Sequence, residues 1–321
     1  MKVAIIGAGG IAGLHRNSYI AQPGVEISAV VDPSPAARER AEKEWGTASF
    51  ATPQELLANA KPDAVSVCSP PKFHGDGVIP CLEAGVPVLC EKPMARTVAE
   101  AQAMVDAAER TKTILMLAFC HRYESPLEQI KTAINDGKLG RVLMVRNRFG
   151  GRQDMTGKWF GDPDIAGGGA ALDTSIHSID IFRFLAGDVA WVDGFTAAYA
   201  PNYRVEDSCV MMLGAKSGAV GVIEGSWSTP GSANIVEVYG SEGAAVVDYN
   251  TGKSQILEKG SSDWKELTPE GPWRFEKEVI EFLSAIRENR QPAITANDGL
   301  QAVRIAQAVY QSQKEGKRIT L

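Results

Sequence analysis

An aspartate and a histidine four residues apart, Asp173 and His177, are spaced to share one face of a helix. They follow three consecutive glycines, and Asp180 lies three residues further on, so a helix over Ala170–Leu185 would align all three side chains. A carboxylate that orients an imidazole lets it relay a proton or bind a substrate hydroxyl. The same spacing also suits an ionic pair that only stabilises the helix, and both interpretations stay open. It is not the spacing of a zinc-binding helix, so we expect no metal.

A glycine-rich turn near the start of the chain has the pattern of a dinucleotide-binding loop. It directly follows the first predicted strand and opens the first predicted helix, and its residues are Gly7, Ala8, Gly9, Gly10, Ile11 and Ala12. The pattern G-x-G-x-x-G/A allows a tight turn, close approach of a pyrophosphate and close packing of helix on strand. The helix N-terminus adds N–H donors and a positive dipole. The sequence therefore predicts a bound dinucleotide.

The choice of dinucleotide depends on Asp32, which ends the second predicted strand. A carboxylate at this point suits the ribose diol of the adenosine half. Because a carboxylate repels a 2′-phosphate, we expect NAD rather than NADP as the cofactor. Arg38 and Arg40 could support NADP, but a solvated helix face explains them better.

Two further loops should border the cofactor, because ligands bind at the carboxyl ends of parallel strands. The first contains Ser69, Pro70 and His74, and it fits either a cofactor-binding loop or an ordinary βα turn. The second, Glu91-Lys92-Pro93, follows the predicted strand Val86–Cys90. Hydride transfer at a carbinol carbon requires a partner that moves the hydroxyl proton. A lysine that is partly desolvated beside a positive nicotinamide is suited to this task, so Lys92 is a candidate acid or base.

Taken together, these motifs resemble the Gfo/Idh/MocA family, which includes glucose–fructose oxidoreductase and inositol dehydrogenase. The resemblance covers essentially the whole chain, including the segment around Asn297–Leu300 and a final strand at Arg318–Leu321. It implies a Rossmann domain followed by a domain with an open antiparallel sheet, which commonly mediates dimers or tetramers. We therefore expect a homodimer or homotetramer formed through the C-terminal sheet.

The resemblance also implies roles for individual residues. The implied catalytic set is Lys92, Asp173 and His177, with the choice of proton acceptor between the lysine and the histidine left open. The implied substrate-binding set adds Arg122, Tyr123 and Trp159, and the Lys92–Pro93 peptide bond is expected to be cis. Between Asp173 and His177, Thr174-Ser175 stands where the family more commonly has a variable residue followed by glycine. We expect the side chain at position 175 to narrow the substrate pocket.

The elements that must position these residues follow two different rhythms. Up to residue 120, short apolar runs alternate with amphipathic segments, which is typical of a parallel sheet covered on both faces. The expected strands are Lys2–Gly7, Glu26–Asp32, Ala64–Cys68, Val86–Cys90 and Ile114–Phe119. The expected helices are Gly10–Ile20, Pro35–Trp45, Gly75–Ala84 and Thr97–Arg110. We predict an α/β fold with a doubly wound NAD-binding Rossmann domain over residues 1–120.

Residues 121–321 are expected to form a substrate-binding α+β domain with a large, open, mostly antiparallel sheet. A strand is expected at Arg141–Phe149, and further strands near 189–200, 205–214, 219–229, 233–240, 244–249 and 254–259. The expected helices are Ser125–Asp136, Ala170–Leu185, Phe275–Glu288 and Asn297–Glu315. Residues 150–166 are rich in Gly, Asp and Pro, so we expect a long functional loop there.

Composition limits the possible partners. The net charge is −6 and the pI is about 5.4. Since nucleic acids and anionic membranes require clustered positive charge, we expect neither as a partner. None of the five cysteines lies in a C-x-x-C spacing, and we expect reduced thiols. The chain opens directly into a predicted strand, without the pattern of a signal peptide, so we expect a cytoplasmic protein.

Three functions remain as hypotheses. We expect an NAD(H)-dependent oxidoreductase that interconverts a secondary alcohol and ketone of a sugar, inositol or sugar derivative. In this hypothesis Lys92 and His177 act together over the nicotinamide ring. The alternatives are a redox-neutral sugar-processing enzyme with tightly bound NAD and a non-catalytic dinucleotide-binding regulator. A regulator would more often lack the lysine or the histidine, and both are present here.

Overall fold

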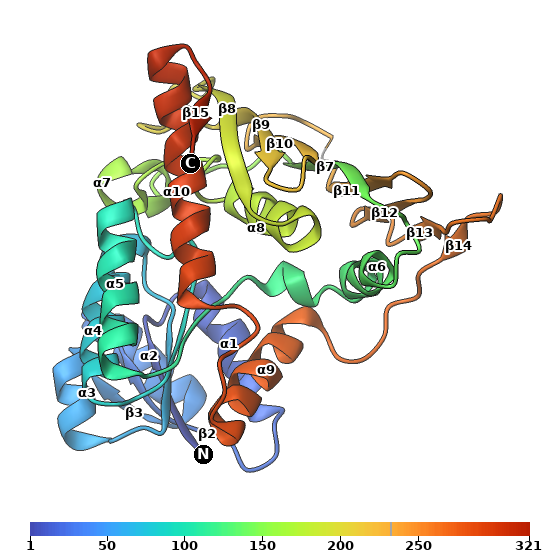
Figure 1. Ribbon diagram of the computed structural model, residues 1–321. Helices are drawn as coiled ribbons and strands as arrows, with labels where there is room; N and C mark the ends of the chain where they lie inside the picture. Colours follow the sequence, from blue (N-terminus) through green and yellow to red (C-terminus); the bar gives the residue numbers. More distant parts are fainter. Residues whose placement is uncertain (232) are drawn as a thin grey trace. The chain divides into compact units, whose positions relative to one another are not determined.

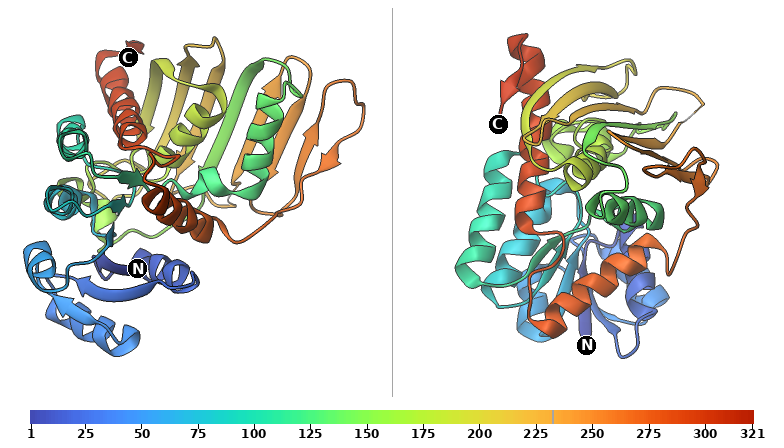
Figure 2. Two further views of the ribbon diagram at one scale, coloured as in Figure 1. Left: turned by 60° about the horizontal axis from the view of Figure 1, so that its bottom comes forward. Right: turned by 45° about the vertical axis from the view of Figure 1, so that its right-hand side comes forward.

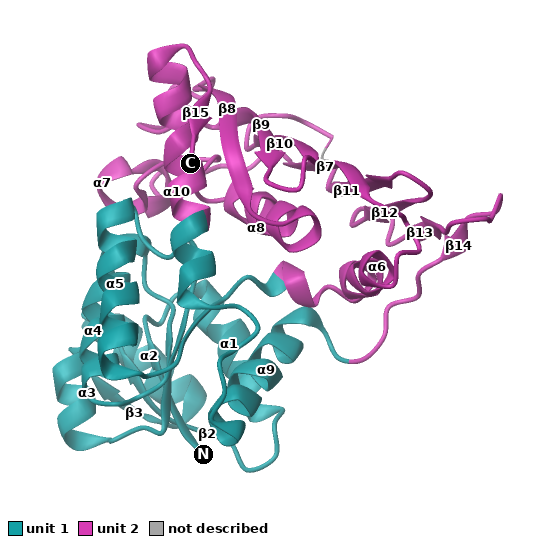
Figure 3. Cartoon of the chain, viewed as in Figure 1, with its two compact units in different colours: residues 1–120, 272–301 teal, residues 121–271, 302–321 magenta. Residues whose placement is uncertain are grey.

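The computed structural model describes residues 1–231 and 233–321, and the chain divides into two compact units (Figures 1 and 3). Unit 1 comprises residues 1–120 and 272–301, and unit 2 comprises residues 121–271 and 302–321. These units share the expected division after residue 120, but they place segment 272–301 with the N-terminal unit. The assignment of cofactor and substrate binding to separate domains stays a prediction.

Unit 1 contains a six-stranded parallel sheet with the strand order β3-β2-β1-β4-β5-β6. Its strands are β1 (Lys2–Ile6), β2 (Glu26–Val31), β3 (Ala48–Phe50), β4 (Ala64–Val67), β5 (Val88–Cys90) and β6 (Leu115–Leu117). Every residue of β4, β5 and β6 is buried, as expected for strands covered on both faces. The strand order reverses between β1 and β4, where doubly wound folds bind ligands. The predicted Rossmann fold is confirmed.

The helices of unit 1 begin at recognisable signals. They are α1 (Gly10–Ile20), α2 (Pro35–Trp45), α3 (Pro53–Asn59), η1 (Pro71–Phe73), α4 (His74–Glu83), α5 (Val98–Thr111) and α9 (Arg274–Glu288). Helices α2, α3 and α5 each follow a hydroxyl side chain that accepts an N–H from the first turn, supplied by Ser34, Thr52 and Thr97. The short elements β3 and α3 were not predicted.

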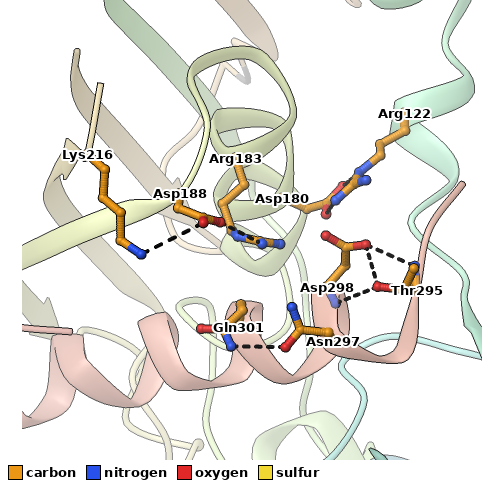
Figure 4. Close-up of polar contacts among 9 residues, drawn as sticks. All are labelled: Arg122, Asp180, Arg183, Asp188, Lys216, Thr295, Asn297, Asp298 and Gln301. Carbon is orange, nitrogen blue, oxygen red and sulfur yellow. Dashed lines mark hydrogen bonds and ion pairs between the residues drawn. The ribbon is translucent and has the colours of Figure 1, made fainter. Parts of the chain in front are cut away.

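Segment 272–301 returns to unit 1 through packing and one bridge. Helix α9 buries an apolar stripe that includes Val279 and Phe282, and it packs on α1. Thr295 then pairs with Met116 of β6 as an antiparallel bridge. Helix α10 (Ala296–Glu315) starts there, and Asp298 Oδ2 accepts hydrogen bonds from both N and Oγ1 of Thr295 (Figure 4). These contacts explain why the compact unit includes the segment.

Unit 2 contains a nine-stranded sheet with the order β14-β13-β12-β11-β7-β10-β9-β8-β15. Its strands are β7 (Val142–Gly150), β8 (Val189–Ala197), β9 (Ser208–Ala215), β10 (Val220–Ser226), β11 (Ile235–Gly240), β12 (Ala244–Asp248), β13 (Ser254–Leu257), β14 (Lys265–Glu266) and β15 (Ile319–Thr320). Strands β7 and β10 pair in parallel, and the other neighbouring strands of this sheet pair antiparallel. The predicted open, mostly antiparallel sheet is confirmed.

The sheet of unit 2 has one covered face. The helices of unit 2 that are shorter than α10 are η2 (Cys120–Tyr123), α6 (Ser125–Asn135), η3 (Trp159–Gly161), α7 (Pro163–Ala166) and α8 (Ser175–Ala186). Helix α8 packs on β7 and β10, and α6 packs on β12 (Figure 2). The stretch 150–166, expected as a long loop, contains η3 and α7. Within the described ranges, no helix has both the length and the apolar character required to cross a bilayer.

Candidate active site

The glycine-rich loop leaves room beside the start of α1. Gly7 has a φ of +96°, and a Cβ at this position would lie 2.6 Å from the Ser69 backbone nitrogen. Gly9 and Gly10 are exposed, and a Cβ on either would meet no heavy atom within 4 Å. Since α1 begins at Gly10 with no side-chain cap, its first N–H groups can bind an anion. The loop fits the pyrophosphate of a dinucleotide.

Asp32 lies directly against this loop. Its Oδ2 accepts a hydrogen bond from the Ala8 N–H (2.9 Å), and its Oδ1 accepts one from the Ser34 N–H (2.9 Å). The arginines of α2 also reach the two loops, with Arg38 donating to the Asp32 carbonyl (2.8 Å) and Arg40 to the Ala8 carbonyl (2.8 Å). Arg40 is exposed and Arg38 is half-buried, so the expected solvated helix face holds for Arg40. Both side chains also donate to backbone carbonyls beside the predicted ribose site.

The loop after β4 holds Ser69, Pro70 and His74 together. His74 is fully buried, and its Nε2 lies 2.7 Å from the Ser69 carbonyl oxygen while its Nδ1 lies 3.1 Å from the Met94 carbonyl oxygen. Burial lowers the pKa of His74. Ser69 Oγ is buried and has no hydrogen-bond partner in the described part of the chain, so it can serve a bound group. The contacts of His74 favour an anchoring role, and its expected contact with the cofactor stays a prediction.

Glu91 and Lys92 follow β5, and the Glu91 side chain contacts His15 of α1. Glu91 is 6% exposed, and its Oε1 lies 2.7 Å from Nε2 of His15, which is 1% exposed. Its Oε2 accepts a hydrogen bond from the Lys92 backbone N–H (3.1 Å). Lys92 is half-buried, and the Lys92–Pro93 peptide bond is cis, as the resemblance implied.

In this buried pair, His15 and Glu91 each shift the pKa of the other. Burial by itself lowers the pKa of His15, but Cys68 and the Glu91 carboxylate together raise it to about 10. Burial by itself raises the pKa of Glu91, but the hydrogen bond and charge of His15 hold it below its usual value. The contact between His15 and Glu91 could not be predicted from local sequence, because the two residues lie 76 positions apart along the chain.

In unit 2, Asp173 lies before α8 rather than in it. The helix begins at Ser175, five residues later than expected, and Asp173 belongs to a turn in which its N–H donates to the Gly169 carbonyl (2.8 Å). His177 lies in the first turn of α8. The prediction that Asp173 shares a helical face with His177 and Asp180 is therefore wrong, because Asp173 belongs to the turn that precedes the helix.

Tertiary contacts hold this turn in place and set the helix start. The Glu206 carboxylate accepts hydrogen bonds from the N–H groups of Gly169 (2.9 Å) and Ala171 (3.0 Å) and from the Tyr310 hydroxyl (2.8 Å). The Glu206 carbonyl accepts the Ala170 N–H (3.0 Å). A Cβ on Gly169 would overlap that carbonyl oxygen. The absence of a side chain at Gly169 thus allows the Glu206 backbone to approach the turn closely.

Arg122 and Asp180 form a buried ion pair (Figure 4). Arg122 Nε and Nη2 donate to the two carboxylate oxygens of Asp180 at 2.8 and 2.6 Å, and the side chains are 11% and 1% exposed. This bidentate contact ties η2 to α8. Tyr123 is the next residue of η2 and is half-buried. The predicted contacts of Arg122 and Tyr123 with substrate stay predictions.

A second histidine, missed in the sequence, lies beside His177. The rings of His121 and His177 are 4.6 Å apart in an edge-on arrangement, and His121 Nδ1 lies 3.1 Å from the Tyr249 hydroxyl. Phe149 packs against both His121 and Tyr249. His121 immediately precedes the Arg-Tyr pair that the resemblance singled out, and this adjacency was the available signal.

Trp159 and Ser175 were both expected to shape the substrate pocket. Trp159 lies in η3 and stacks on Phe160 with ring centroids 3.7 Å apart, and its predicted contact with substrate stays a prediction. Ser175 does not narrow a pocket: it is fully buried, its Oγ lies 3.1 Å from Cys209 Sγ, and a Cβ on Gly225 would overlap it. The small residue of β10 makes the space for this hydroxyl.

Comparison with known proteins places both halves of the chain. Residues 1–119 match the model of an oxidoreductase family with an NAD-binding Rossmann fold, and residues 127–246 match the GFO/IDH/MocA C-terminal domain. D-glucoside 3-dehydrogenase of Escherichia coli (strain K12) is 35% identical over 191 residues, which are 58% of this chain and 54% of that protein. Myo-inositol 2-dehydrogenase of Thermotoga maritima is 26% identical over 335 residues, covering 100% of this chain and 98% of that protein.

A solved structure shares the whole architecture. Levoglucosan dehydrogenase in complex with NADH matches with a TM-score of 0.94 and 24% identity, covering 100% of this chain and 98% of that one. At this identity the likeness establishes the fold.

Proposed function

Because the chain belongs to the Gfo/Idh/MocA oxidoreductase family and has its NAD-binding Rossmann domain, we propose that it interconverts a secondary alcohol and the matching ketone of a sugar, an inositol or a sugar derivative. One observation carries this proposal. A half-buried lysine, Lys92, follows β5 at the carboxyl edge of a sheet whose glycine loop and Asp32 fit NAD. The named relatives, a D-glucoside dehydrogenase and an inositol dehydrogenase, support the substrate class.

Individual residues receive distinct roles in this proposal. NAD, when bound, accepts or donates the hydride. Lys92 or His177 carries the hydroxyl proton, and Asp173 orients the histidine or the substrate. Arg122, Tyr123 and Trp159 bind or shape the site for substrate, with Arg122 held in place by Asp180.

Turnover measured by NADH absorbance on a panel of sugars and polyols tests the proposal. Lys92→Ala and His177→Ala should each lower kcat about 10²–10⁴-fold, the usual range for loss of a general acid or base. The residue whose removal abolishes the pH dependence of kcat is the proton carrier. Lys43→Ala, on the exposed face of α2, is the control and should leave kcat unchanged.

Two outcomes would favour the other hypotheses. Purified protein that retains NAD through dialysis and yields no net NADH with any substrate would indicate a redox-neutral reaction. NAD binding without turnover, insensitive to both alanine substitutions, would indicate a regulator.

We propose NAD rather than NADP as the working dinucleotide, on the basis of the Asp32 carboxylate. The position of Arg38 and Arg40 beside the same loops means that loss of this charge would expose two guanidinium groups to a 2′-phosphate. Asp32→Asn should lower kcat/KM for NAD about 10–100-fold and raise it for NADP, since a hydrogen bond to a charged group contributes about 1.5–3 kcal/mol. Asp63→Asn is a matched control, because Asp63 also accepts a backbone N–H in unit 1, at the start of β1.

We further propose that a homodimer or homotetramer forms through the sheet of unit 2. The face opposite α6 and α8 exposes Phe195, Val210 and Met212 on neighbouring strands. Contiguous exposed apolar side chains mark interaction surfaces.

A further inference from the structure

A chain of buried polar side chains crosses the interior of unit 1 and ends at Lys92. The Tyr19 hydroxyl lies 2.8 Å from Ser66 Oγ, which lies 3.2 Å from His15 Nδ1. His15 Nε2 lies 2.7 Å from Glu91 Oε1, and Glu91 Oε2 accepts the Lys92 backbone N–H. Tyr19 and Ser66 are fully buried, as is nearly all of His15 and Glu91. Three elements contribute: α1, β4 and the end of β5.

A purely structural purpose does not require charges in this place. Ionic pairs inside a protein are weak evidence for stability, because apolar side chains of similar volume usually stabilise as well or better. His15 and Glu91 nevertheless form such a pair among apolar neighbours, with Ile5, Ala12 and Cys68 forming a buried cluster beside it. We therefore look for a role of this ion pair other than stabilisation of the fold.

The pair of His15 and Glu91 connects the elements that carry the two parts of the site in unit 1. Helix α1, which carries His15, begins at the glycine loop that fits the pyrophosphate. Glu91 immediately precedes Lys92 and fixes its backbone N–H. A movement of α1 relative to β5 would be transmitted through His15 and Glu91 to Lys92, because both contacts are direct hydrogen bonds.

We propose that His15 is a positioning residue, which holds Glu91 and through it keeps Lys92 in register with the dinucleotide-binding loop. The inference rests on the proposed function of Lys92 as a residue of the active site. It assigns His15 no contact with substrate or cofactor. It predicts that loss of His15 affects the catalytic step more than the binding of NAD.

Three variants test this proposal. His15→Leu removes the donor and the charge, and His15→Gln keeps a donor that can reach Glu91. Ser18→Ala is the matched control, because Ser18 is buried on the same helix and its hydroxyl donates to the Leu14 carbonyl. His15→Leu should lower kcat about tenfold or more while the KM for NAD changes less than about threefold. His15→Gln should recover a substantial part of kcat, and Ser18→Ala should retain it.

A second measurement does not depend on turnover. The rate at which acetic anhydride acylates the Lys92 amine, followed by mass spectrometry against Lys2 and Lys43 as internal references, reports the surroundings of this side chain. The rate should change about threefold or more in His15→Leu and stay constant in Ser18→Ala, because only the neutral amine reacts and its surroundings set how much of it is present. If His15→Leu does not fold, Glu91→Gln should give the same change in acylation, because it breaks the same pair from the other side.

Equal acylation rates at Lys92 in wild type, His15→Leu and Glu91→Gln would overturn the inference, as would an equal kcat in His15→Leu and Ser18→Ala. A wild type that turns over no sugar or polyol would count against the proposed function alone. The acylation rates would then still decide the role of His15.

Discussion

At the scale of single residues, the charge of His15 makes the stability of unit 1 depend on pH. The pKa of His15 is about 10 in the folded protein and 6.5 as its ordinary value. A group whose pKa is raised by folding contributes stability that is fully present below its unfolded pKa and is lost as the pH rises through its folded pKa. The stabilising contribution of His15 should therefore decline between about pH 6.5 and pH 10.

His15→Gln tests this sign. The free energy of unfolding of the wild type should fall, relative to that of the variant, by up to about 1.4 kcal/mol for each pH unit in this range. Urea unfolding at several pH values measures the difference, and the other titrating groups largely cancel because both proteins contain them. A difference that does not vary with pH would mean that His15 is neutral in the folded protein.

Residues that belong to a local motif could be predicted, and residues that act through tertiary contacts could not. The glycine loop, Asp32 and Lys92 stand next to strand ends, so their position in a doubly wound sheet follows from chain order. His15 and Glu91 meet across 76 residues, and His121 meets Tyr249 across 128. Nothing in local spacing encodes such encounters, because each partner would be equally acceptable on a surface.

At the scale of elements, the turn before α8 depends on a glycine that no other residue can replace without a shift of backbone. Gly169→Ala would drive its Cβ into the Glu206 carbonyl oxygen. We expect a loss of stability of about 1–3 kcal/mol, the usual result of overpacking. The kcat should also fall, because this turn positions Asp173 and the start of α8, while NADH affinity should be retained. Urea unfolding, NADH titration and steady-state kinetics measure the three effects.

Gly9→Ala should have the opposite effects, with stability retained and NADH affinity lowered. The φ of Gly9 is −78° and a Cβ there meets only open space, so alanine should be tolerated without loss of stability. The added methyl would occupy the space that fits the pyrophosphate, and NADH affinity should fall about tenfold or more. If Gly9→Ala binds NADH normally, or if Gly169→Ala is as stable as wild type, the assignment of these two turns is incorrect.

The boundaries of elements could be predicted where the residues at the boundary decide them. Helices α1 and α2 begin and end at the expected residues, because glycine, proline and a serine cap mark their starts. The start of α8 was expected five residues too early. There the glycine run and Asp173 are locally compatible with a helix, but the Glu206 carboxylate, which also accepts the Tyr310 hydroxyl, binds the backbone of the preceding turn.

At the scale of the whole molecule, the return of segment 272–301 to unit 1 lacked a local signal. Helix α9 has the ordinary apolar stripe of a surface helix, and this stripe does not specify which of two cores it will cover. The bridge between Thr295 and Met116 is a single pairing that no strand pattern announces. The fold class could be predicted because alternation of elements determines it, whereas this crossing depends on the completed core.

The open sheet face of unit 2 exposes apolar side chains on neighbouring strands. Val210 is 50% exposed on β9 and lies between Phe195 of β8, 61% exposed, and Glu224 of β10. Met212, two residues along β9, is 46% exposed on the same face. Leaving these side chains in water is unfavourable, and burying each one against a second copy would contribute about 1–2 kcal/mol. Introducing carboxylates there would instead require burial of unpaired charge.

The double variant Val210→Glu, Met212→Glu should therefore be monomeric where the wild type is a dimer or tetramer, as measured by sedimentation equilibrium or light scattering. Its secondary structure should be unchanged, because both side chains already point into solvent within one chain. Ile280→Glu is the control: Ile280 is an exposed apolar residue of α9 in unit 1, and its replacement should leave the mass unchanged. A wild type that is monomeric at micromolar concentration would show that this face is not an interface. A double variant that keeps the wild-type mass would show the same, since an interface built on these residues could not tolerate two buried carboxylates.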